Sequence, residues 1–119
     1  MKIMRKLSDF KDADGIVVAS KIFSSIMRIL SNEKNREQST AKNPFDMFSA
    51  FMANSPDEMH EIFAILSDAE PSEYHCDGTE SLVNMMVLAN DPVIVSLFIS
   101  QGQKGDAKTS ASASENTEE

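Results

Sequence analysis

Apolar side chains recur at helical spacing in several separate stretches of the chain. The clearest stretch is 12–31, where apolar residues occupy one half of a helix and Ser, Lys and Arg occupy the other half. The apolar half contains Ile16, Ala19, Ile22, Phe23, Ile26, Met27, Ile29 and Leu30, and the polar half contains Ser20, Lys21, Ser24, Ser25 and Arg28. The spacing therefore predicts an amphipathic helix over 12–31.

Three further helices are predicted to open on a proline that follows a capping residue. Asn43 precedes Pro44, Ser55 precedes Pro56, and Asn90-Asp91 precedes Pro92. Asn and Ser accept the free N–H groups of a first turn, and proline suits the first helical position. Ser55 and Glu58 have the spacing of a capping box, which predicts a helix running to about Asp68. The apolar face of the helix that opens at Pro44 contains Phe45, Phe48, Phe51 and Met52. The apolar face of the helix that opens at Pro56 contains Met59, Ile62, Phe63 and Leu66.

Two helices are predicted in the last apolar part of the chain. The first covers about 79–89, capped by Asp77 or Thr79, and its high apolar fraction indicates burial on most sides. The second is the helix that opens at Pro92, already named above. It runs to Gly102, where glycine would end it, although its β-branched residues also suit a strand.

The remaining segments are polar or ambiguous. Residues 1–10 suit an extended arm, an edge strand or a helix, whereas 32–42 lacks a large apolar side chain and predicts a solvated loop or frayed helix end. Residues 102–119 also lack bulky apolar residues and predict a disordered tail. The predicted fold is all-α: one domain over 1–101, a small bundle of about five short helices with a basic N-terminal arm.

Charge is divided unevenly along this chain of 119 residues, whose net charge is −8. Residues 1–42 hold nine of the eleven Lys and Arg residues with five acids, a charge of +4. Residues 43–103 hold ten acids and no Lys or Arg, a charge of −10, and the tail adds −2. So acidic a body argues against binding to nucleic-acid phosphates or an anionic membrane.

The sequence contains few residue patterns that indicate catalysis or cofactor binding. The glycines form no phosphate-binding loop, and one cysteine with two histidines is too little for a structural zinc site or a disulfide scaffold. Catalytic residue types adjoin only in Tyr74-His75-Cys76-Asp77, which we interpret as a loop with a partly buried cysteine. We therefore expect no catalytic residue, no cofactor and no metal. No signal-peptide or membrane-spanning apolar run is present, so a reducing cytoplasm is expected.

Methionine and phenylalanine are concentrated on the predicted apolar faces. Eight methionines occur in the chain, and five of them lie on these faces, namely Met47, Met52, Met59, Met85 and Met86. They either fill the core or line a surface that accepts varied apolar helices, because methionine is flexible and polarizable. A small helical domain with this much apolar surface would cover any excess by self-association or by binding a client.

Four blocks of sequence resemble the tail assembly chaperones of long-tailed bacteriophages. They are the basic opening 2–9 (KIMRKLSD), the Ala- and Ile-rich helix through Ala19, Ile22 and Ile26, the block 59–68 (MHEIFAILSD), and the acidic step into 82–88 (LVNMMVL) with the closing Leu97-Phe98 helix. The resemblance covers about residues 2–101.

The resemblance implies a small helical protein without enzymatic activity. Such a protein binds the long tape measure protein in the bacterial host cytoplasm, helps to recruit the major tail protein, and is absent from the mature virion. It also implies self-association into rings or spirals, and in many members a longer frameshifted form.

The residues themselves suggest how copies or clients would be bound. We expect the basic Lys2, Arg5 and Lys6 to dock on the acidic face of a neighbour, with apolar contacts from Phe45, Phe48 and Phe51 or from Leu97 and Phe98. Two alternatives remain: an acidic inhibitor or DNA mimic that binds a basic host enzyme, and an enzyme that uses His75 and Cys76.

Overall fold

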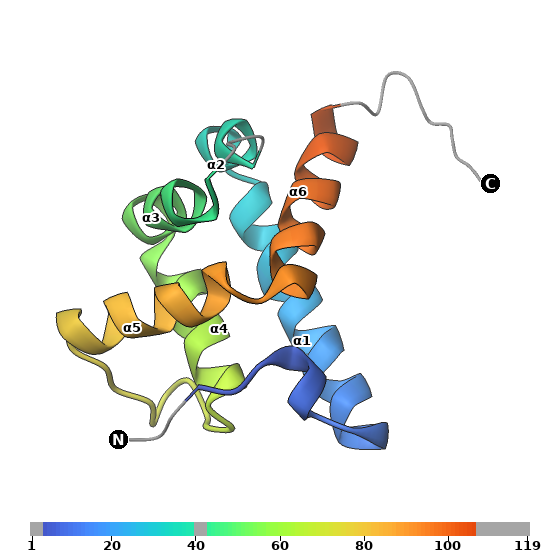
Figure 1. Ribbon diagram of the computed structural model, residues 1–119, viewed down its shortest axis with the longest axis vertical. Coiled ribbons are helices and arrows are strands. Elements are labelled where there is room, and N and C mark those ends of the chain that lie inside the picture. Colours follow the sequence, from blue (N-terminus) through green and yellow to red (C-terminus); the bar gives the residue numbers. More distant parts are fainter. Residues whose placement is uncertain (1–3, 40–42, 107–119) are drawn as a thin grey trace.

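The computed structural model describes residues 4–39 and 43–106, of which 103–106 are described by their backbone only. This part of the chain forms six α-helices, one short 3₁₀ helix and no strand (Figure 1). The elements are η1 (Leu7–Asp9), α1 (Asp12–Leu30), α2 (Glu33–Gln38), α3 (Pro44–Asn54), α4 (Pro56–Leu66), α5 (Gly78–Ala89) and α6 (Pro92–Asp106). The all-α prediction is confirmed, and no strand forms over 4–10 or over 92–101. Residues 1–3 of the predicted arm lie outside the described residues.

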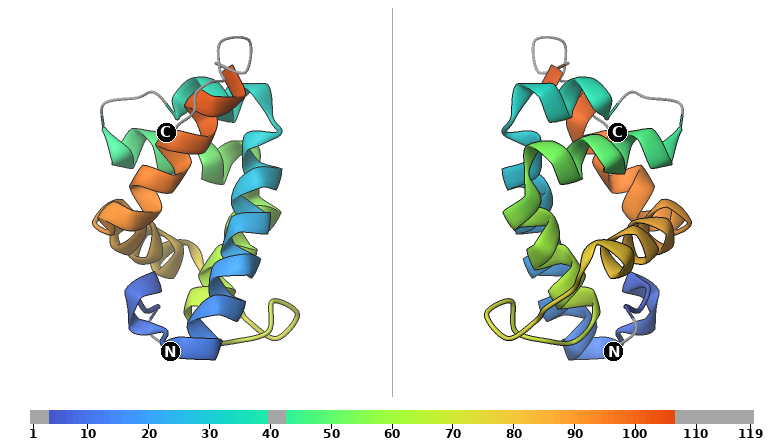
Figure 2. Two further views of the ribbon diagram at one scale, coloured as in Figure 1. Left: turned by 90° about the vertical axis from the view of Figure 1, so that its right-hand side faces the viewer. Right: turned by 90° about the vertical axis from the view of Figure 1, so that its left-hand side faces the viewer.

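The helices form two layers with a cap at one end. The helices α1 and α4 pack against each other in one layer, and α5 and α6 pack against each other in the second layer (Figures 1 and 2). The short α2 and the adjacent α3 close the end at which α1 finishes, and both contact the second layer. η1 packs against α1 at the opposite end.

Side chains from every layer meet in one core. Phe48 and Phe51 of α3 and Phe98 of α6 are fully buried, with ring centroids 4.9–5.8 Å apart. Around them lie the buried aliphatic residues of α1, α4, α5 and α6, among them Ile22, Ile26, Ile29, Met59, Ile62, Leu66, Leu88 and Ile94. The edge-to-face contacts of Phe48 are favourable for aromatic rings and fix where α3 meets α6.

Three of the predicted caps are present and one is not. At the start of α6, Asp91 Oδ1 accepts the Val93 N–H at 3.1 Å. Asn43 Oδ1 accepts the Phe45 N–H, and Asp77 with Glu80 forms a reciprocal capping box at the start of α5. Ser55 makes no such bond, so the capping box predicted with Glu58 is wrong. The Ser55 hydroxyl instead accepts a hydrogen bond from the buried amide of Asn35 at 2.9 Å.

The polar loop predicted over 32–42 is wrong in its central part. Residues 33–38 form α2, capped by Asn32, and Asn35 within it is fully buried. Asn35 Nδ2 donates to the carbonyl of Ile29 and to Ser55 Oγ, and its Oδ1 accepts from Asn54. A polar side chain therefore ties α2 to the end of α1 and to the α3–α4 junction, which is why a segment without large apolar residues is held in place.

Two predicted ends also differ in the structure. α4 ends at Leu66, because Asp68 takes a left-handed backbone conformation (φ 59°) and the Ala69 N–H donates a hydrogen bond to the carbonyl of Ala64. α6 continues through Gly102 to Asp106, so Gly102 does not end the helix and the tail does not begin at 102. The rest of the predicted tail, 107–119, lies outside the described residues.

Candidate functional site

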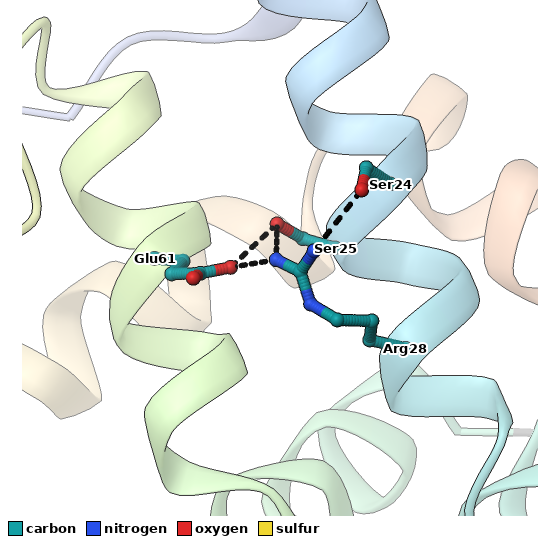
Figure 3. A network of polar contacts seen from close by, with 4 residues as sticks. All are labelled: Ser24, Ser25, Arg28 and Glu61. Atoms are coloured by element: carbon teal, nitrogen blue, oxygen red, sulfur yellow. Dashed lines mark hydrogen bonds and ion pairs between the residues drawn. The ribbon is translucent and has the colours of Figure 1, made fainter.

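A cleft of about 1010 Å³ lies between α1, α4 and the segment that joins α4 to α5. The walls carry five carboxylates and two basic side chains, namely Glu61, Asp68, Glu70, Glu73, Glu80, Lys21 and Arg28. Arg28 of α1 forms an ion pair with Glu61 of α4 across the cleft (Figure 3). Ser25 Oγ donates to the same Glu61 oxygen at 3.1 Å, and Ser24 Oγ accepts from the Arg28 guanidinium at 3.0 Å. The network braces α1 against α4.

The loop beside this cleft does not assemble a nucleophile and base. Cys76 is half-buried, and its Sγ lies 3.3 Å from Ser81 Oγ, whereas His75 is exposed. The histidine that contacts this loop is His60, whose Nε2 is 2.7 Å from the carbonyl oxygen of Tyr74. Within 4–39 and 43–106, no group of three His, Cys, Asp or Glu side chains could hold a metal ion. The geometry therefore gives the hypothesis of a His75–Cys76 enzyme no support.

Among the basic N-terminal residues, Arg5 makes contacts within its own chain. The Arg5 guanidinium lies 3.2 Å from Asp68 and 4.4 Å from the centre of the Phe10 ring, and the Arg5 N–H donates to the carbonyl of Leu66. Met4 is buried in the core, so this segment packs against the bundle instead of extending as a free arm. Lys6 is exposed, and Lys2 lies outside the described residues.

Most of the aromatic residues predicted to bind a partner face inward. Phe48, Phe51 and Phe98 have no exposed surface, so they cannot contact a partner in this fold and the prediction is wrong for them. Phe45 remains 39% exposed. Leu97 is half-buried and lines a shallow groove on α6 with Pro92 and Val93.

Apolar side chains that the sequence places in the core are instead exposed on two helices. Ile16, Phe23 and Met27 share one face of α1, since they are seven and four residues apart, and are 73%, 45% and 43% exposed. We call them the α1 stripe. Leu82, Val83 and Met86 are exposed together on α5, and we call them the α5 stripe.

The two stripes overturn two predictions about burial. The helix α5 is not buried on most sides, because among its residues only Asn84 and Leu88 are buried. On α1, the polar-half residue Ser25 is buried, whereas four members of the apolar half are exposed, namely Ile16, Ala19, Phe23 and Met27. The sequence did contain a signal of this exposure, because α1 and α5 hold more apolar residues than one helix face can bury.

Comparison with known proteins adds no relationship: no family model, no curated protein and no solved structure matches the chain. No single helix in the described part of the chain is long and apolar enough to cross a membrane. The helix α5 and residues 92–102 meet that criterion only as a pair, and they are bent by 80° relative to each other.

Proposed function

We propose that this chain is a non-enzymatic tail assembly chaperone of a long-tailed bacteriophage, acting in the host cytoplasm and absent from the mature virion. Its client is the tape measure protein, and it aids recruitment of the major tail protein. Self-association of copies is part of the proposal. The sequence resemblance over 2–101 supplies the family, and the exposed apolar surface of the small helical fold supports a binding role.

The α5 stripe is the observation that carries the proposal. Leu82, Val83 and Met86 are 56%, 46% and 51% exposed, and they lie adjacent on one helix because 82 and 86, and 83 and 86, are four and three residues apart. Contiguous apolar side chains on a small protein are typical of an interaction surface. Leucine and methionine adapt their shapes to an incoming helix, as a chaperone with a long and varied helical client requires.

Co-expression with the tape measure protein tests the proposal. The chaperone should keep the long coiled-coil client in the soluble fraction and co-purify with it. Leu82→Glu places a charge in the middle of the α5 stripe and should abolish both effects. The matched control is Ala53→Glu, which adds the same charge at an exposed alanine of α3. Failure of the unmodified chain to retain the client, or equal retention by Leu82→Glu, contradicts the proposal.

An acidic inhibitor is the second candidate, because five carboxylates line the cleft beside only two basic side chains. In this case the partner is a basic nucleic-acid-binding enzyme of the host. Such a complex should dissociate as salt is raised and should weaken in Glu70→Gln/Glu73→Gln, variants that leave the α5 stripe unchanged. Leu82→Glu should then have no effect on binding, which separates the two candidates.

A further inference from the structure

We draw no further inference here: the strongest candidate, the exposed apolar α1 stripe of Ile16, Phe23 and Met27 at the edge of the first layer, carries none because nothing in the structure shows what covers it.

Discussion

Gly102 of α6 lies so close to Ser39, at the end of α2, that a Cβ on Gly102 would come within 2.5 Å of the Ser39 Cβ and closer still to its hydroxyl. Both residues are buried. The absent side chain lets the two helices touch, so this glycine serves close packing where the sequence suggests a helix end. The contact fixes the last turns of α6 against the cap of the bundle.

The first prediction concerns this contact. Alanine favours a helix interior over glycine by about 1 kcal/mol, but the steric overlap at position 102 outweighs this preference. Gly102→Ala should lower the free energy of unfolding by about 1–3 kcal/mol, measured by urea denaturation. Gly78→Ala is the control: nothing lies within 4 Å of its added Cβ, and it should raise stability by about 0.4–1 kcal/mol. Equal effects at both positions would show that the overlap relaxes freely.

Helix starts were predictable because their causes are local. Asn43 and Asp77 cap the helices that follow them through bonds two or three residues away, and short-range chemistry of this kind is visible in sequence. The helix α2 was not predicted, because its stability depends on Asn35, whose partner Ser55 is 20 residues away. Nothing local distinguishes this buried asparagine from the exposed polar residues around it.

The second prediction therefore concerns Asn35. Asn35→Ala removes the donor to Ser55 and to the carbonyl of Ile29, both in buried contacts, and the acceptor of the exposed Asn54. It should lower the free energy of unfolding by about 1–3 kcal/mol in thermal or urea melts. Asn90→Ala is the control, because Asn90 is exposed and its amide donates only within its own helix, to Met86. That variant should stay within about 0.5 kcal/mol of the unmodified chain. A matching loss in both variants would contradict a special role for Asn35.

The sequence predicts which segments are helical better than it predicts which apolar residues are exposed. Phe45, Phe48 and Phe51 share one spacing, yet Phe45 is 39% exposed and the other two are fully buried. Sequence periodicity identifies an apolar face but not the part of it that other helices cover. The same limit explains why the exposed stripes of α1 and α5 were assigned to the interior.

The third prediction separates Phe45 from Phe48. Phe48→Ala empties space beside Phe51 and Phe98 and should cost about 3–5 kcal/mol of unfolding free energy. Phe45→Ala should cost less than about 1 kcal/mol, because part of its ring is already in water. Chemical denaturation of both variants measures the difference. Comparable losses would mean that the ring of Phe45 is as well packed as that of Phe48.

The fourth prediction concerns the ion pair that bridges the cleft. The side chains of Arg28 and Glu61 are 49% and 38% exposed, so water and salt screen their attraction. A double-mutant cycle with Arg28→Gln and Glu61→Gln should give a coupling of about 0.2–1 kcal/mol that falls as salt is raised. The Arg5–Asp68 pair provides a comparison, since Asp68 is 70% exposed and the two side chains are 3.2 Å apart.

The coupling of Arg28 with Glu61 should be the larger of the two. Glu61 also accepts from the buried hydroxyl of Ser25, which holds the carboxylate toward α1 and reduces the side-chain entropy lost when Arg28 binds it. Ser25→Ala should therefore weaken the Arg28–Glu61 coupling and leave the Arg5–Asp68 coupling unchanged. If Ser25→Ala leaves both couplings unchanged, the ion pair orients itself without the hydroxyl, and the brace between α1 and α4 consists of two independent contacts.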